Sequence, residues 1–148
     1  MEIYNCRPVD ARLTTSGQPS EEQLAALAGE GFEVVINLAL HDIPQYSLRD
    51  EPGLVRSLGM AYVHIPVQFT DPTEADLLAF FAAMDLHQHR KVLIHCAANK
   101  RVTAFLGLHR VLRQGWPPAE AFALMRSVWE PDPVWSAFIA AMLEKYRG

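Results

Sequence analysis

The sequence predicts an α/β domain with a central, mainly parallel sheet of about four or five strands, helices on both faces and a helical C-terminal section. Apolar segments typical of buried strands alternate with amphipathic helical segments along the chain. Strands separated by helices form a parallel sheet, because each connecting helix packs back onto one of its faces. The chain has 148 residues, and we expect residues 1–148 to form a single domain.

The N-terminal part begins with residues 3–16, which alternate loosely between apolar and polar. We interpret them as one or two short edge strands. A helix should follow, because Ser20 and Gln23 fit a capping box, in which each side chain bonds to the backbone of the other residue. Gly29 or Gly31 can end this helix.

Three buried strands are predicted at residues 32–38, 60–67 and 91–95, where the sequence is apolar and rich in β-branched side chains. The mostly polar segment 37–51 between the first two should be a surface loop. A short helix is expected to begin near Pro52, because proline fits the first turn of a helix.

Further helices are predicted after the second and third strands. Thr73 and Asp76 are typical of the N-terminal cap of the first of these helices. The apolar spacing then indicates a helix over residues 101–112. Two more amphipathic helices, over residues 118–129 and 133–146, should form the C-terminal section.

The charge of the chain argues against several classes of partner. Lys and Arg number 13 and Asp and Glu 17, so the net charge is −4. A mildly acidic chain has no general attraction for nucleic acid or anionic membranes, and any anion site must be local. No apolar run reaches the ~18 residues of a membrane span, and the first residues lack the pattern of a signal peptide. We therefore expect a cytoplasmic protein without nucleic-acid or membrane partners.

Residues 94–103, with the sequence IHCAANKRVT, lie between the third strand and the following helix. In open α/β sheets, ligands bind at the carboxyl ends of strands. A loop of small residues there can turn its N–H groups inward, and the next helix adds partial positive charge. Ala97, Ala98, Asn99 and Lys100 are therefore candidate anion-binding residues. In this glycine-free loop, Asn99 is best able to take a left-handed conformation.

Cys96 and Arg101 are the candidate reactive residues of this loop. A cysteine at such a position would be stabilised as a thiolate and could act as a nucleophile. The planar guanidinium of Arg101 can bind two phosphate oxygens. The His95 side chain should point away from the anion and orient the loop from beneath. A lone buried cysteine is usually a small core residue, but this combination favours an anion-binding Cys/Arg loop.

The loop resembles the signature of cysteine-dependent protein tyrosine and dual-specificity phosphatases. That signature is His-Cys, five residues, Arg, then Ser or Thr, and the matching residues here are His95, Cys96, Arg101 and Thr103. Three upstream segments resemble a small bacterial phosphatase-like branch of the superfamily: Ser16–Pro19, Val35–Leu38 and Ile65–Val67. The resemblance covers roughly residues 13–113. It implies a phosphatase-like domain that acts on a phosphorylated protein or small molecule, without a cofactor or metal.

One departure concerns the loop length, because four residues instead of five separate Cys96 from Arg101. Thr103 stands seven positions after Cys96, as in the usual motif, but Arg101 is one place early. In one interpretation, which we favour, the loop is tighter and Arg101 still binds phosphate. In the other, the loop keeps its usual path, Val102 occupies the arginine position and Arg101 points elsewhere.

The resemblance also implies the reaction. Cys96 would attack phosphorus and form a phosphocysteine, an aspartic acid would protonate the leaving oxygen, and its carboxylate would then activate water. Asp71, in the segment after the second strand, is our candidate for this acid. Asp42 is an alternative, and so is Asp76, although Asp76 is better explained as the partner of Thr73.

Two other functions fit parts of the same pattern. The missing loop residue suggests a catalytically weak pseudophosphatase that binds phosphate or a phosphoprotein. The four-residue spacing also resembles rhodanese-type sulfurtransferases, in which Cys96 would carry a persulfide. His95 and the upstream segments favour a phosphatase. Phosphotyrosine, phosphoserine, a lipid phosphate and a nucleotide are all substrates that the sequence leaves open.

Overall fold

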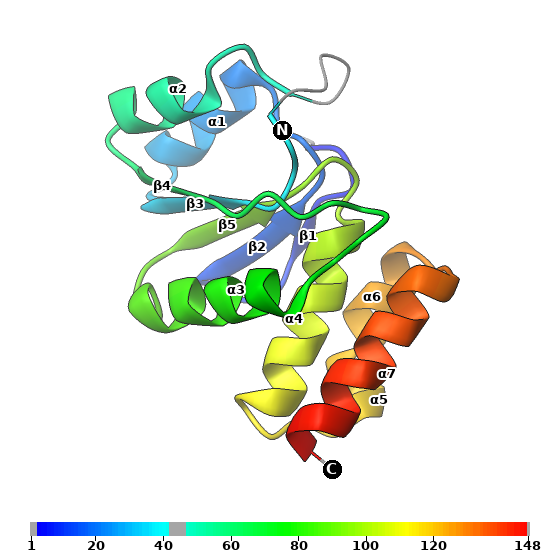
Figure 1. Ribbon diagram of the computed structural model, residues 1–148. Coiled ribbons are helices and arrows are strands. Elements are labelled where there is room, and N and C mark those ends of the chain that lie inside the picture. The colour runs from blue at the N-terminus through cyan, green and yellow to red at the C-terminus, as the bar shows by residue number, and fades with distance from the viewer. Residues whose placement is uncertain (1–2, 42–46, 148) are drawn as a thin grey trace.

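A computed structural model describes residues 3–41 and 47–147, and its centre is a five-stranded sheet (Figure 1). The strands are β1 (Arg7–Pro8), β2 (Leu13–Ser16), β3 (Val34–Asn37), β4 (Ala61–His64) and β5 (Val92–His95). Their order is β1-β2-β5-β3-β4. Only the β1–β2 pair is antiparallel, and the other three pairs are parallel. The predicted mainly parallel sheet is therefore confirmed.

Helices cover both faces of this sheet, as predicted (Figure 1). One face carries α1 (Glu21–Gly29) and α2 (Glu51–Ser57), and the other carries α3 (Glu74–Leu86) and α4 (Lys100–Leu112). The helical C-terminal section packs around α4 and consists of α5 (Pro118–Ala121), α6 (Ala123–Val128) and α7 (Pro133–Arg147). None of the described helices is long and apolar enough to cross a bilayer.

Two helices begin with the side-chain caps that the sequence predicted. Ser20 accepts a hydrogen bond from the Gln23 N–H, and the Gln23 side chain bonds back to the Ser20 N–H, which completes the capping box. The Thr73 hydroxyl likewise accepts from the Asp76 N–H at the start of α3. The prediction of a single helix over residues 118–129 is wrong. The chain leaves helical geometry at Phe122 and forms α5 and α6 instead.

β2 is not an edge strand, in contrast to our expectation for the N-terminal segment. It lies between β1 and β5, and only β1 takes the edge position. The loose alternation of apolar and polar residues suggested an edge position, yet Thr15 and Ser16 are fully buried. Their hydroxyls are satisfied by the carbonyl oxygens of Arg7 and Gly17.

The strands alternate their side chains between two core layers. Val35 and Leu93 pack towards α1 and α2, whereas Ile36 and Ile94 pack towards α3 and α4. The same alternation ends each parallel strand with a polar residue. These residues pair in register across the carboxyl edge of the sheet, in the order Ser16, His95, Asn37 and His64. We call these four residues the polar row. They lie at the edge of the sheet where β5 continues into the loop that leads to α4.

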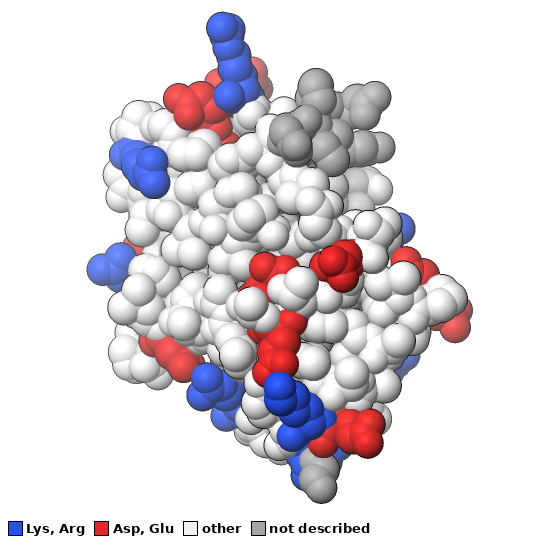
Figure 2. Space-filling model, viewed as in Figure 1, with Lys and Arg blue, Asp and Glu red and all other residues white. Residues whose placement is uncertain are grey.

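The charged side chains do not form a broad basic surface on the face shown in Figure 2. Among the residues drawn in colour, acidic side chains gather near its centre and basic ones lie mainly towards the periphery. This distribution agrees with the net charge of −4. On this face, attraction for an anion therefore has to come from a small number of groups.

Candidate active site

The loop after β5 turns the chain sharply into α4. Asn99 has φ 65°, the left-handed conformation that the sequence predicted for it. Its side-chain nitrogen donates to the carbonyl oxygen of Asn5 (2.9 Å) and to the hydroxyl of Thr15 (3.0 Å). Asn5 in turn donates from its side chain to the carbonyl oxygen of Ala98 (3.1 Å). The N-terminal segment and β2 therefore hold the end of the loop.

A cavity of about 470 Å³ opens beside this loop. Its lining comes from the N-terminal segment, the segments after β3 and β4, the loop itself and the start of α4. The lining residues are Tyr4, Leu40, Gln68, Phe69, Thr70, Cys96, Ala97, Ala98, Lys100 and Arg101. Cys96 is a free cysteine that lines this cavity and is fully buried.

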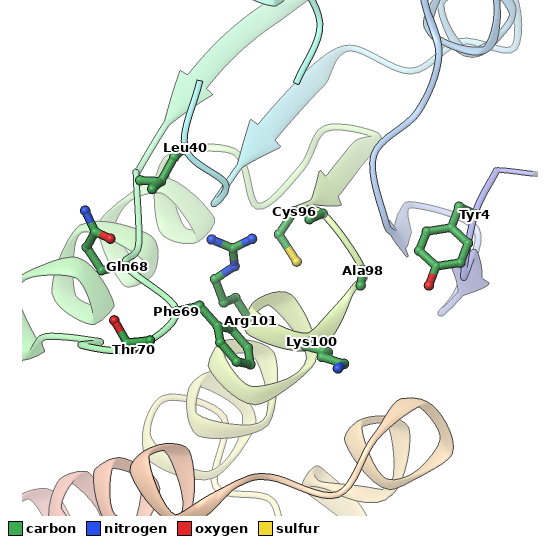
Figure 3. A pocket seen from close by; sticks show the side chains of 10 residues that line it. Tyr4, Leu40, Gln68, Phe69, Thr70, Cys96, Ala98, Lys100 and Arg101 are labelled. Atoms are coloured by element: carbon green, nitrogen blue, oxygen red, sulfur yellow. The ribbon is translucent and has the colours of Figure 1, made fainter. Parts of the chain in front are cut away.

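Arg101 extends from the first turn of α4 towards Cys96, and its guanidinium lies on the same side as the cysteine sulfur (Figure 3). One guanidinium nitrogen, Nη1, donates to the carbonyl oxygen of Val67 at 2.9 Å. The Nε atom is buried and has no hydrogen-bond partner within residues 3–41 and 47–147. Val102 is fully buried in the core. Arg101 therefore lines the cavity, whereas Val102 does not.

Lys100 brings a second cation to the cavity. Its Nζ lies 5.7 Å from the centre of the Trp129 ring and 6.0 Å from that of Phe69. These distances fall within the range of cation–π attraction. Two aromatic rings therefore hold the amino group near the cavity wall.

The segment Ser16–Pro19 has a definite physical role beside the loop. Gly17 forms an isolated bridge with Ala98, and a Cβ atom added at Gly17 would lie only 2.6 Å from the carbonyl oxygen of Ala97. Only glycine fits this close approach of two backbones. The N–H of Gln18 donates to the same Ala97 oxygen at 3.0 Å. The segment therefore fixes the loop from its outer side.

His95 lies on the α1/α2 side of the sheet and does not line the cavity. Its Nε2 is 2.6 Å from Glu51 Oε2, and its Nδ1 is 3.1 Å from the carbonyl oxygen of Cys96. The Gln18 amide donates to Glu51 Oε1 at 2.9 Å. Burial alone would raise the pKa of Glu51, but the hydrogen bond and the charge of His95 outweigh it and lower that pKa.

Sequence reasoning missed Glu51. Its position just before Pro52 suggested only the beginning of a helix, and its side chain is 2% exposed. A buried carboxylate cannot be recognised from local sequence, because its partner His95 lies 44 residues away.

The candidate acid Asp71 is exposed and is not among the residues that line the cavity. Its neighbour Thr70 does line it, and the Asp71 N–H donates to the carbonyl oxygen of Gln68 at 3.0 Å. Asp76 is the cap partner of Thr73, as expected, and Asp42 lies outside the described residues. Within residues 3–41 and 47–147, no carboxylate lines this cavity.

Thr103 supports the loop from within α4. Its hydroxyl donates to the carbonyl oxygen of Asn99 at 2.8 Å and accepts from Trp129 Nε1 at 3.2 Å. It does not line the cavity. The other cysteine, Cys6, is half-buried outside the cavity, and burial raises its pKa although nearby Arg7 partly opposes this. The part of the chain that the structure describes contains no cluster of three potential metal ligands.

The chain belongs to the family described as DSP-PTPase phosphatase fused to NAD+ kinase, whose model matches residues 4–129. It is thus a member of the cysteine phosphatase superfamily. A beta-lactamase hydrolase-like protein of Xylella fastidiosa (strain Temecula1) is 32% identical over 110 residues. The match covers 70% of this chain but only 24% of that protein, so the chain spans about a quarter of this relative's length.

Solved structures share the fold. A putative phosphatase from Shewanella putrefaciens CN-32 is 37% identical with a TM-score of 0.85, and the match covers 97% of this chain and 94% of that one. A variant of P. aeruginosa TpbA in complex with pTyr is 17% identical with a TM-score of 0.71, over 97% and 91% of the two chains. The second likeness concerns the fold alone.

Proposed function

We propose that the protein is a phosphoric monoester hydrolase in which Cys96 is the nucleophile and Arg101 binds the phosphoryl group. The observation that carries the proposal is the guanidinium beside the Cys96 sulfur, with a buried Nε that lacks a partner among the described residues. A buried donor without a partner costs free energy, and an anionic oxygen would satisfy it. Membership of the phosphatase family supports the same conclusion.

The reaction has two steps. The Cys96 thiolate attacks phosphorus, an S–P bond forms, and the bond from phosphorus to the leaving oxygen breaks. The leaving oxygen takes a proton, for which we propose Asp71 as the acid. The Asp71 carboxylate then takes a proton from water, which attacks phosphorus, and the S–P bond breaks to release inorganic phosphate and the thiolate. During both steps, Arg101, Lys100 and the N–H groups of Ala97, Ala98 and Asn99 would stabilise the phosphoryl oxygens.

The substrate is a phosphorylated protein or small molecule, and we favour an aryl phosphate. Tyr4 and Phe69 line the cavity and offer flat apolar surfaces to an aromatic ring. A fold neighbour was solved with pTyr bound, which agrees with this choice. No cofactor enters the reaction.

Hydrolysis of a small aryl phosphate tests the proposal. Wild type should release phosphate, Cys96→Ser should be inactive, and Arg101→Ala should be strongly impaired. If the wild type is no more active than Cys96→Ser, the protein is not a phosphatase. Binding of vanadate without any turnover would identify it as a phosphate-binding pseudophosphatase instead.

Sulfur transfer is the second candidate function. It is favoured by the four-residue spacing and by the lack of a carboxylate among the described lining residues, because sulfur transfer requires no acid for a leaving alcohol. The Cys96 thiolate would attack the outer sulfur of thiosulfate and release sulfite, and cyanide would then take that sulfur from the persulfide to form thiocyanate. A thiosulfate–cyanide assay decides between the two reactions.

A further inference from the structure

The side chain of Lys100 is in contact with aromatic rings that come from outside the loop. We propose that Trp129 is a positioning residue, which holds the Lys100 amino group at the cavity where it binds the phosphoryl group. The C-terminal section thereby takes part in anion binding. This role rests on the proposed function, because Lys100 is one of the residues that would bind the substrate.

The Lys100 amino group needs support from its surroundings. Lys100 and Arg101 are neighbours in the first turn of α4, but their side chains extend in different directions (Figure 3). Arg101 is fixed by its hydrogen bond to Val67. Within residues 3–41 and 47–147, no ion pair or hydrogen bond fixes the half-buried Lys100 side chain. A lysine side chain is long and flexible, so an unsupported amino group would move among many positions.

Two ring faces supply this support. The Nζ atom of Lys100 lies 5.7 Å from the centre of the Trp129 ring and 6.0 Å from that of Phe69. At such distances the electron-rich face of a ring attracts a positive charge. The guanidinium carbon of Arg101 lies 5.9 Å from the centre of the same Phe69 ring. Phe69 therefore faces both Lys100 and Arg101, and Trp129 faces Lys100 alone.

Trp129 is itself held in place by two elements. Its Nε1 donates to the Thr103 hydroxyl of α4 at 3.2 Å. Its ring packs against Trp135 of α7, with 6.0 Å between the ring centres, and against Phe69, with 5.7 Å. The ring that faces Lys100 is therefore tied both to α4 and to the C-terminal section.

Trp135 completes this arrangement from a fully buried position. Its Nε1 donates to the carbonyl oxygen of Phe69 at 2.7 Å, which fixes the segment after β4. Phe69, Trp129 and Trp135 thus form an aromatic cluster that joins this segment to the end of α6 and to α7. Phe69 and Lys100 line the cavity, but Trp129 does not. We therefore expect Trp129 to affect a bound anion only through Lys100.

The position of Lys100 can be measured without any ligand or turnover. The chain has three lysines, Lys91, Lys100 and Lys145, so their ε-methylene signals can be followed by proton–carbon correlation NMR, with Lys100 assigned from Lys100→Arg. The ring current above an aromatic face should shift the Lys100 signal upfield relative to the urea-unfolded chain. Trp129→Leu should reduce this shift. An unshifted Lys100 signal in the wild type, or an equal shift in Trp129→Leu, would overturn the proposal.

Two further variants separate the ring of Trp129 from its other contacts. Trp129→Phe keeps an aromatic ring but loses the N–H that bonds Thr103, so it should retain much of the shift. Trp116→Leu is the matched control, because the Trp116 ring lies 4.4 Å from the guanidinium carbon of Arg110 and outside the cavity. It should leave the Lys100 signal unchanged. An equal loss of the shift in Trp116→Leu would show a general effect on the fold and overturn the proposal.

Binding of inorganic phosphate tests whether Trp129 acts through Lys100. The parent is Cys96→Ser, which cannot form a phosphocysteine, and it is titrated with phosphate by NMR. Lys100→Met should weaken binding roughly tenfold, as when a hydrogen bond to a charged group is lost. Trp129→Leu should weaken it about threefold, in the range of a cation–π contact.

The decisive comparison is Trp129→Leu in the Lys100→Met background. A residue that acts only through Lys100 should have no further effect there, because the two changes remove the same interaction. Equal losses with and without Lys100 would assign Trp129 a structural role and overturn the proposal. Absence of phosphate binding by Cys96→Ser would overturn it as well.

These results separate the role of Trp129 from the proposed function. Phosphate binding that depends on Trp129 only through Lys100, without hydrolysis of phosphate esters by the wild type, would keep the positioning role and reject the hydrolase. Hydrolysis by the wild type, with no coupling between Trp129 and Lys100, would do the reverse.

Discussion

Arg101 donates a hydrogen bond from Nη1 to the carbonyl oxygen of Val67 across 2.9 Å. This bond joins the start of α4 to the segment after β4, which supplies Gln68, Phe69 and Thr70 to the cavity wall. The position of the guanidinium therefore depends on both the first turn of α4 and the segment after β4. With four residues between them, Cys96 and Arg101 line the same cavity.

The first prediction concerns the planar shape of this guanidinium. Arg101→Lys keeps the charge but loses the fork that can bond Val67 and a phosphoryl oxygen together. We expect kcat/KM for an aryl phosphate to fall roughly 100-fold, as when one donor to a developing oxyanion is removed. Arg113→Lys, at the exposed C-terminal end of α4, should leave the activity unchanged. An active Arg101→Lys enzyme would show that charge alone suffices.

The second prediction concerns the contact of Gly17 with the loop. Gly17→Ala places a Cβ atom 2.6 Å from the Ala97 carbonyl oxygen, so the two backbones must separate. The free energy of unfolding, measured with urea, should fall by about 1–3 kcal/mol, the usual cost of overpacking. Gly29→Ala is the control, because a Cβ atom there meets nothing within 4 Å. If both variants are equally stable, the loop is not held at Gly17.

The third prediction concerns Asp71 as the general acid. Protonation matters most for a poor leaving group, so Asp71→Asn should cost roughly 100-fold with an alkyl phosphate and little with a nitrophenyl phosphate. Asp76→Asn, which keeps the N–H that Thr73 caps, is the control and should show no such dependence. Equal losses on the two substrates would assign the proton transfer to another group.

The fourth prediction concerns stability at acidic pH. Burial lowers the pKa of His109 to about 4, although Asp85 opposes this, whereas the ordinary value is 6.5. As the pH falls, the unfolded chain therefore takes up this proton at a higher pH than the folded chain does. The free energy of unfolding is highest above pH 6.5 and falls as the pH drops towards 4. At pH 5 the free energy of unfolding should be about 2 kcal/mol lower than at neutral pH.

Urea unfolding at neutral pH and at pH 5 checks this loss. His109→Leu should not show it, since leucine cannot take up a proton. His89→Leu changes an exposed histidine and should retain the wild-type loss. A His109→Leu variant that loses as much stability as the wild type would contradict the assignment.

Local patterns in the sequence were sufficient to predict most of the fold. The strands over residues 32–38 and 91–95 were recognisable because they are apolar and β-branched, and Ser20 and Thr73 marked helix starts through their hydroxyls. The interior position of β2 was not predictable, because Thr15 and Ser16 are buried with their hydroxyls bonded to carbonyl oxygens, and the local pattern of apolar and polar residues does not show this.

The residues of the candidate site were also predictable only in part. Cys96, Arg101 and the left-handed Asn99 could be found because they share one short loop whose residue types suit an anion. Glu51 could not be found, because its contact with His95 joins the start of α2 to a residue 44 positions later in the sequence. The position of Asp71 outside the cavity lining could not be predicted either, because it depends on the path of the segment after β4, which sequence spacing does not determine.

The most direct test of the central claim is the covalent state of Cys96 during turnover. The protein is mixed with an aryl phosphate, quenched rapidly and digested, and its peptides are analysed by mass spectrometry. We expect a phosphate adduct on the peptide containing Cys96 and none on that containing Cys6, with a burst of phenol that matches the adduct. Undiminished phosphate release by the Cys96→Ser variant, without any adduct, would contradict it.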